Sequence, residues 1–313
     1  MKILVTGASG FVGAAVIHRL TSEAQNVLPV YRNAHHSGLA IGNINGSTDW
    51  SGTLTKITHV IHTAARVHIM KASVTDPLEA FRKTNAEGTL NLARQAAEAG
   101  ATRFIFISSI KVNGEQTKAD MAFTEKDVSA SDDPYAISKY EAEVGLRNLA
   151  TETGLEVVII RPPLVYGPGV KANFLSLMKL VRVGLPLPLG RIDNRRSMIF
   201  LDNLVNFIST CLHHPKAKNQ TFLVSDGEDL SVTQLLRKLA SAMNTPSRLI
   251  PIPSSWLKIA LSLVGKKCIA DRLCGSLHVS ITKAQTLLGW SPISSVDEGL
   301  KKTVKFFLEN SSK

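Results

Sequence analysis

The chain has 313 residues, of which 44% are hydrophobic and 19% charged, and this composition is typical of a globular protein and excludes a disordered one. No apolar run approaches the roughly 18 residues that a membrane helix needs, and the chain begins without the pattern of a secretory signal, so we expect a cytoplasmic protein with no transmembrane segment. The formal net charge is +11, but the basic residues are scattered and form no nucleic-acid-binding motif, so we expect no nucleic-acid partner.

Strands and helices are predicted to alternate through the first half of the chain. The predicted strands are residues 2–7, 26–32, 57–65, 103–109 and 155–161, and the predicted helices are residues 11–23, 86–100 and 134–154. Apolar strands separated by helices indicate βαβ units around a parallel sheet. We therefore predict an α/β fold, with a Rossmann-type doubly wound parallel sheet and a smaller C-terminal α/β part that binds the substrate.

The pattern changes after RPPLVYGPG, which ends at residue 169. A helix is predicted from about residue 173, and SMIFLDN, residues 197–203, has the pattern of a strand that returns to the sheet. We predict an NAD(P)-binding domain over residues 1–166, with roughly 199–226 returning to it. Most of residues 167–313 would then form the substrate-binding part.

Three further helices are predicted near the end of the chain. Two capping boxes, Ser231 with Gln234 and Ser295 with Glu298, mark two helix starts. WLKIALSLVGKK, residues 256–267, reads as a short amphipathic helix with basic flanks, which would suit a membrane surface. Its apolar spacing is ordinary for a helix that packs on a core, and packing in the smaller part is our expectation.

Cysteines and histidines give no sign of a metal site. The three cysteines are odd in number and form no CxxC, so we expect reduced thiols without a catalytic role. The histidines that invite a metal interpretation lack carboxylate or cysteine companions, so we predict no metal. These residues are Cys211, Cys268 and Cys274, and His62, His68, His213 and His214.

A glycine-rich turn is predicted between the first strand and the first helix. TGASGFVG places Gly7, Gly10 and Gly13 there, with Phe11 and Val12 at the start of the helix. The first glycine would allow the tight turn, the second would let the backbone approach a pyrophosphate, and the third would let helix and strand pack closely. The helix start would supply N–H groups to the phosphates, so all five residues are predicted to bind a dinucleotide.

The type of dinucleotide is less clear from the second strand. An acidic residue at its end would favour NAD, but the strand ends Tyr31-Arg32-Asn33. Arg32 could pair with a 2′-phosphate or stack on the adenine. The predicted cofactor is NAD, with NADP possible.

Three residues are predicted to form a catalytic group. Ser109 ends a strand at the carboxyl edge of the sheet, where ligands bind in doubly wound folds. Tyr135 lies in the next helix, with Lys139 one turn further on the same face. An ammonium near a phenol lowers the pKa of the phenol, which would suit proton exchange with a sugar hydroxyl near neutral pH.

Taken together, six motifs in order resemble an extended short-chain dehydrogenase/reductase of the nucleotide-sugar epimerase/dehydratase branch. The motifs are TGASGFVG, HTAA (62–65), TN (84–85), SSIKVNG (108–114), YAISK (135–139) and RPPLVYGPG (161–169), and LGWSP (288–292) extends the resemblance toward the C-terminus. The resemblance implies a Rossmann fold and a Ser-Tyr-Lys site, with Tyr135 as general acid or base, Ser109 bonded to the reacting oxygen and Lys139 modifying the pKa and holding the nicotinamide ribose. We also expect a homodimer.

The same resemblance implies further site residues. Ala64 and Ala65 would line the cofactor, with Asn43 and Ile44 near the adenine. The expected substrate residues are Asn85, Ser109, Asn173, Arg195 and Arg196. Because a strand alternates its side chains, only one of the two arginines can readily face the substrate, and by motif alignment that one is Arg195.

Several reactions could follow from removal of hydride at C4 of a sugar. Dehydratases of this family carry Asp-Glu where this chain has Ile110-Lys111, and a lysine without a partner carboxylate is a poor substitute, so dehydration is disfavoured. The predicted function is a C4 epimerase acting on a UDP-hexose or UDP-N-acetylhexosamine in cell-surface polysaccharide synthesis. The alternatives are a 4-keto reductase that makes a UDP-deoxy-amino sugar, a steroid-like or flavonoid-like reductase, and a non-catalytic nucleotide-binding regulator.

Overall fold

The structure is a computed structural model that describes residues 1–34, 38–67, 76–118, 121–129, 131–263 and 265–310. Its main sheet has seven parallel strands within these residues, in the order β3-β2-β1-β4-β5-β6-β9. The strands are β1 (Lys2–Thr6), β2 (Asn26–Tyr31), β3 (Leu39–Ala40), β4 (His59–His62), β5 (Arg103–Ile107), β6 (Glu156–Arg161) and β9 (Gln220–Leu223). The predicted Rossmann-type sheet is therefore confirmed.

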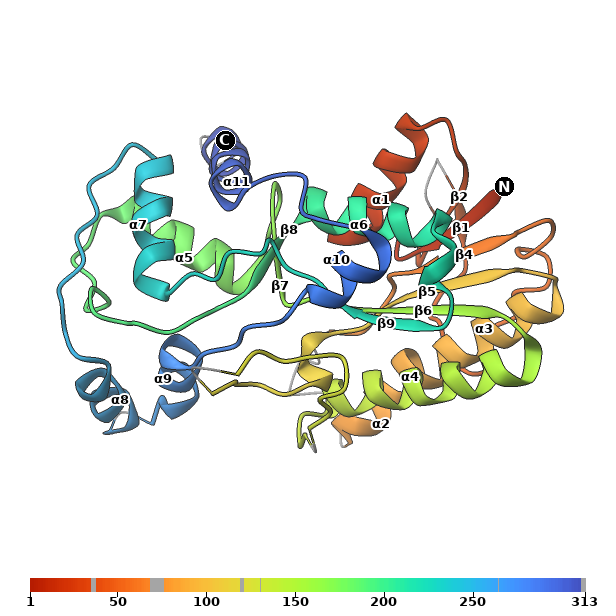
Figure 1. Ribbon diagram of the computed structural model, residues 1–313, viewed down its shortest axis with the longest axis horizontal. Helices are drawn as coiled ribbons and strands as arrows, with labels where there is room; N and C mark the ends of the chain where they lie inside the picture. The colour runs from red at the N-terminus through yellow and green to blue at the C-terminus, as the bar shows by residue number, and fades with distance from the viewer. Residues whose placement is uncertain (35–37, 68–75, 119–120, 130, 264, 311–313) are drawn as a thin grey trace.

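Helices cover both faces of this sheet. In Figure 1, α1 (Phe11–Ser22) and α6 (Leu201–His213) lie on one face, and α3 (Gly88–Glu98) and α4 (Pro134–Thr153) lie on the other. Every residue of β5 is buried, as expected of a central strand that is apolar on both sides. Two hydrophobic cores result, one on each face of the sheet.

The strand predicted at SMIFLDN does not join the main sheet. β8 (Met198–Phe200) pairs instead with β7 (Leu164–Tyr166) in a separate parallel pair. The chain returns to the main sheet only with β9, which pairs with β6 after α6 and the short turn η3 (Pro215–Ala217). The sequence pattern gave the wrong sheet for this strand, because three consecutive buried apolar residues are equally compatible with either sheet.

A second group of helices forms the smaller part, which lies beside the sheet in Figure 1. It comprises α5 (Ala172–Val183), α7 (Val232–Ala242), α8 (Ser254–Leu263), α9 (Lys267–Cys274) and α11 (Val296–Asn310), with α10 (Thr282–Leu288) packed near the sheet. Both predicted capping boxes are confirmed, because each serine and its partner three residues later exchange hydrogen bonds. The division at residue 166 into two domains stays a prediction.

The helix predicted at 256–267 is shorter than expected and is packed only in part as expected. It corresponds to α8, and none of its side chains is buried. Leu257 contacts the core of the smaller part, whereas Trp256, Ile259 and Leu263 are exposed. The expected packing in the smaller part is therefore found for Leu257 but not for the other large apolar residues, because apolar spacing marks a helix face without showing what covers it.

Candidate active site

The glycine turn after β1 has no room for side chains. Gly7 has a φ of +70°, a left-handed conformation that favours glycine, and a Cβ there would lie 2.8 Å from the amide nitrogen of Ala64. A Cβ at Gly13 would lie 2.2 Å from the carbonyl oxygen of Gly7. These contacts explain the first and third glycines of the motif as a tight turn and a close helix approach.

The start of α1 is open toward the same turn. Gly10 precedes the first helical residue, Phe11, and among the described residues no side chain caps this helix start. Uncapped N–H groups and the positive end of the helix dipole favour an anion. The predicted phosphate contacts at Gly10, Phe11, Val12 and Gly13 are therefore chemically reasonable, although they stay predictions.

The other predicted cofactor residues follow the ends of neighbouring strands. Arg32 is exposed directly after β2, and Asn43 is exposed a few residues after β3. Ile44 is half-buried and packs on the core beneath α3. Ala64 and Ala65 are half-buried after β4, where the Ala64 amide lies 3.3 Å from Thr6 Oγ1. All of these positions lie beyond the carboxyl ends of parallel strands, where doubly wound folds bind their ligands.

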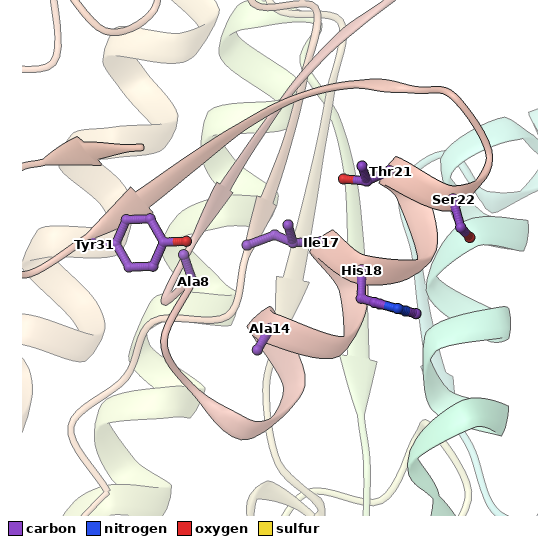
Figure 2. Close-up of a pocket in the computed structure, with 7 residues that line it drawn as sticks. All are labelled: Ala8, Ala14, Ile17, His18, Thr21, Ser22 and Tyr31. Atoms are coloured by element: carbon purple, nitrogen blue, oxygen red, sulfur yellow. The ribbon is translucent and has the colours of Figure 1, made fainter. Parts of the chain in front are cut away.

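A hollow of about 510 Å³ lies along the outer side of α1 (Figure 2). Ala8 and Tyr31 bound it near the glycine turn, and His18, Thr21 and Ser22 extend it along the helix. None of Ser109, Tyr135 and Lys139 lines it. The hollow is therefore separate from the predicted catalytic group.

Ser109 and Tyr135 are brought together across the sheet edge. Ser109 lies two residues after the end of β5, and Tyr135 lies in the first turn of α4. Burial raises the pKa of Tyr135 to about 12, while a hydrogen bond with the Ser109 side chain acts in the opposite direction. The Tyr135 ring also packs edge-on against Phe81, in α2 (Pro77–Arg82), with 5.9 Å between ring centroids.

Lys139 lies one turn further along α4 and is almost completely buried. Its Nζ donates a hydrogen bond of 2.8 Å to the carbonyl oxygen of Ile107 and lies 4.3 Å from the centre of the Phe106 ring. Burial lowers the pKa of Lys139 to about 7, and the charge of Glu143 acts against this fall. Near neutral pH the amine is therefore divided between its charged and neutral forms.

The lowering of the Tyr135 pKa by Lys139 stays a prediction, and the protein's own residues shift this pKa in the opposite direction. The pKa of the phenol is raised, because burial dominates and the negative charge of Asp133 adds to it. The ammonium is directed to the Ile107 carbonyl. The sequence placed the two residues on one helical face but gave no measure of how deeply each is buried.

Lys111 has a carboxylate partner that the sequence analysis did not foresee. It lies in the short helix η2 (Ile110–Val112), and its ammonium pairs with Asp133. Asp133 also caps α4, because its Oδ1 accepts a 2.9 Å bond from the Tyr135 amide. The Lys111 Nζ lies 6.0 Å from the centre of the Tyr135 ring, so this ion pair borders the predicted catalytic phenol.

Asn85 lies in η1 (Lys83–Glu87), a π-helical segment between α2 and α3, and such segments are frequent at functional sites. Its amide oxygen accepts a 2.8 Å bond from the Arg66 amide, and its amide nitrogen donates to Ser138 Oγ at 3.1 Å. Asn85 thus joins the segment after β4 to α4 beside Lys139. This geometry favours a supporting role, and direct contact with the substrate stays a prediction.

A buried ionic network beneath the site was missed from the sequence. Glu143 is fully buried and accepts bonds from Ser108 Oγ at 2.6 Å and from Arg161 Nη2 at 2.6 Å. Arg161 in turn donates to Asn113 Oδ1 at 3.0 Å. The network ties the end of β5 to β6 and α4. The spacing of Lys139 and Glu143, one helical turn apart, was the available signal.

The predicted substrate residues of the smaller part are less closely gathered. Asn173 is exposed in the first turn of α5. Arg196 is half-buried, and its Nη1 donates bonds of 3.0 Å to the carbonyls of Arg272 and Gly275. Arg195 is exposed. Of the two arginines, Arg195 is therefore the one with its charge available, although its contact with a substrate is untested.

His62 has local hydrogen-bond partners. The buried His62 ring lies between Thr6 Oγ1 at 2.7 Å and Thr89 Oγ1 at 3.0 Å, and burial lowers its pKa to about 3. His68 lies outside the described residues. Within the part of the chain that the structure describes, no cluster of three or more histidine, cysteine or acidic side chains could hold a metal.

A family model for the NAD dependent epimerase/dehydratase family matches residues 3–225. The chain belongs to this family. A UDP-glucose 4-epimerase of Vibrio cholerae is 47% identical over 98% of this chain and 96% of its own length. An N-acetyl-alpha-D-glucosaminyl-diphospho-ditrans,octacis-undecaprenol 4-epimerase of Escherichia coli O157:H7 is 25% identical over 97% of this chain and 95% of its own. The structure of a UDP-glucose 4-epimerase of Thermotoga maritima with UDP-glucose has a TM-score of 0.77 at 25% identity, covering 99% of this chain and all of that one.

As a member of the epimerase/dehydratase family, the chain is an NAD-dependent enzyme. The described residues fit the cofactor at both ends of the site. At one end, the helix start after Gly10 has no side-chain cap among the described residues and can bind a phosphate-sized anion. At the other end, the predicted pair Tyr135 and Lys139 lies one helical turn apart in α4, and its contact with the cofactor stays a prediction.

Proposed function

We propose that this enzyme is a nucleotide-sugar C4 epimerase that acts on a UDP-hexose or UDP-N-acetylhexosamine for cell-surface polysaccharide synthesis. The observation that carries the proposal is the placement of Ser109 just after β5, beside Tyr135 in the first turn of α4, with the buried Lys139 one helical turn further on. The 47% identical relative named as a UDP-glucose 4-epimerase supports the choice of reaction and of nucleotide sugar.

In this proposal, NAD held at the glycine turn would supply the acceptor for the C4 hydride of the sugar and the donor for its return to the opposite face. Tyr135 accepts the proton of the C4 hydroxyl as the hydride leaves and gives it back when the hydride returns. Ser109 bonds the same sugar oxygen and holds it beside the phenol. Because the hydride and the proton are both returned, the reaction consumes no cofactor.

Proton exchange requires the phenol to be more acidic than it is in the structure, where its pKa is about 12. Positive charge close to the phenol would lower that pKa. Two lysines would supply it: Lys111, whose Nζ lies 6.0 Å from the centre of the Tyr135 ring, and Lys139, one helical turn along α4. We propose that Lys139 is the principal source, because its family motif couples it to the tyrosine.

Replacement of Tyr135 by phenylalanine tests the proposal. Loss of a general acid–base group lowers the rate by about 10²–10⁴-fold, so kcat should fall by that factor while NAD stays bound. Tyr140→Phe is the matched control, because Tyr140 is exposed on the same helix. UDP-glucose and UDP-N-acetylglucosamine are the substrates to supply, with NMR detection of the C4 epimer. Tyr135→Phe activity within threefold of wild type would remove Tyr135 from the mechanism.

The dinucleotide that the protein carries distinguishes the epimerase from the reductase. An epimerase regenerates NAD in each turnover, so the denatured protein should release NAD. A protein that is purified without bound dinucleotide, and that oxidises NADPH when a 4-keto sugar nucleotide is supplied as substrate, would instead be the reductase. Oxidation of steroid substrates without any sugar epimerisation would favour the steroid-like alternative.

A lipid-linked sugar diphosphate is the second candidate substrate. The exposed apolar side chains of α8 favour it, because a substrate held in a membrane requires its enzyme to reach the membrane surface. The relative from Escherichia coli is named for such a substrate. Epimerisation of N-acetylglucosaminyl-diphospho-undecaprenol at least tenfold faster than that of UDP-N-acetylglucosamine would replace the nucleotide sugar by this substrate.

A further inference from the structure

The helix α8 presents an apolar face to solvent. Trp256, Ile259 and Leu263 are 69%, 60% and 83% exposed, and their spacing of three and four residues places them on one face of the helix. Leu257 lies on the opposite side and contacts the core of the smaller part. The helix is therefore anchored by one side, while its outward side carries three large uncovered apolar residues.

The neighbouring helix carries a further exposed apolar residue. α9 packs against α8, and its Ile269 is 46% exposed. In Figure 1 the two helices lie at the edge of the smaller part, with α8 outermost and distant from the seven-stranded sheet. A helix at such an outer edge is well placed to meet a surface.

The charge on α8 and α9 is mainly positive. From Ser254 to Cys274, which spans α8 and α9, the basic residues are Lys258, Lys266, Lys267 and Arg272, and the acidic residue is Asp271. Lys258, Lys266 and Lys267 are exposed, the first within α8 and the other two at its junction with α9. The apolar face is thus accompanied by positive charge, which calls for an anionic partner.

We propose that α8 docks this enzyme on the surface of a bilayer that contains anionic lipids. A helix lying in the membrane interface places apolar side chains among the acyl chains and basic side chains among the headgroups. Tryptophan favours that interface because one end of its ring system is apolar and the other donates a hydrogen bond. Within the described residues no helix is long and apolar enough to cross a membrane, so the contact is with the surface.

A second copy of the chain fits this face less well. In a two-fold dimer the same patch meets itself, so Lys258, Lys266 and Lys267 would approach their own counterparts. Like charges at an interface oppose association. An anionic membrane surface satisfies both the apolar and the basic side chains.

Tryptophan fluorescence gives a direct readout of docking. The chain has three tryptophans, and Trp50 and Trp290 are buried whereas Trp256 is exposed. Vesicles of phosphatidylcholine with 30% phosphatidylglycerol should shift the emission of the wild-type protein to the blue and sediment with it. Trp256→Phe should abolish the shift while much of the sedimentation remains.

The decisive comparison uses two triple variants. Trp256→Ser/Ile259→Ser/Leu263→Ser removes the outward face of α8, and Val183→Ser/Leu185→Ser/Ile293→Ser removes three exposed apolar residues elsewhere. The α8 variant should lose vesicle binding by at least about tenfold. The control variant should bind within twofold of wild type. Thermal unfolding of both variants, with a transition as cooperative as that of wild type, shows that each is folded.

Three results would overturn the proposal. The first is that wild-type protein does not sediment with the anionic vesicles at 50 mM salt. The second is equal binding to vesicles of phosphatidylcholine alone, since that would remove the role of the basic residues. The third is that the α8 variant still binds vesicles, or that it loses only a self-association seen without lipid, which would assign the face to a second copy.

Discussion

Replacing Lys139 by methionine should change how the stability of the protein depends on pH. The lysine is almost completely buried, and burial lowers its pKa from 10.5 to about 7 in the folded protein. The unfolded chain therefore binds more protons than the folded chain between these two values, and this site makes the wild-type protein more stable as pH rises. Methionine fills a similar volume without titrating, so the variant lacks this contribution.

The expected size follows from the two pKa values. At about 1.36 kcal/mol per pKa unit, the free energy of unfolding of wild type should gain about 3 kcal/mol from this site between pH 6.5 and pH 9.5. The variant also loses the bond from Nζ to the Ile107 carbonyl. That loss costs about 1–3 kcal/mol, but it is the same at both pH values and cancels from the comparison.

Urea unfolding at pH 6.5 and pH 9.5, without added cofactor, measures the effect. The stability of Lys139→Met relative to wild type should be about 3 kcal/mol more favourable at pH 6.5 than at pH 9.5. Lys179→Met, which alters an exposed lysine of α5, is the control and should show no such change. An equal difference between Lys139→Met and wild type at both pH values would refute the reasoning, because the amine would then stay charged in the folded protein.

Three other predictions concern the glycine turn, the cofactor and the two arginines. Gly13→Ala should destabilise the protein by several kcal/mol in urea unfolding, because the added Cβ would lie 2.2 Å from the Gly7 carbonyl oxygen and only the backbone can move away. Unchanged stability would contradict this packing. Arg32→Asp should weaken NADP binding and leave NAD binding equal or better in titrations, and an unchanged preference would remove Arg32 from contact with a 2′-phosphate. Arg195→Ala should raise KM for a UDP-sugar by roughly ten- to hundredfold with little change in melting temperature, because a diphosphate bond is worth about 1.5–3 kcal/mol. Arg196→Ala should instead lower the melting temperature, since it loses two bonds to backbone carbonyls, and the reverse pattern would exchange the two roles.

The sheet was predictable because its strands are short apolar runs separated by helices. β1, β4, β5 and β6 lie within the predicted ranges, and β2 keeps its strand despite Pro29. The pairing of β8 was not predictable, because three buried apolar residues do not indicate which sheet they enter. β3 escaped notice since it has only two residues, both exposed.

Within the site, spacing along the sequence identified the candidate groups but not their surroundings. The register of α4 placed Tyr135 and Lys139 on one face. Burial and ion pairing depend on segments that are distant in sequence, and this is why the partner of Lys111 and the raised pKa of Tyr135 were not foreseen. Glu143 was missed for the same reason, since it lies in α4 whereas its partner Arg161 lies in β6.

The position of β9 makes the two halves of the chain inseparable during folding. A fragment ending at residue 166 would contain every residue predicted to bind the cofactor, yet it would lack both β9 and α6. The edge of β6 would then present unpaired backbone groups, and the core that α6 covers would be open to water. During synthesis, the sheet cannot be completed until Leu223 has been added. The nascent chain therefore exposes the unpaired edge of β6, which can pair with other chains, while more than sixty further residues are synthesised.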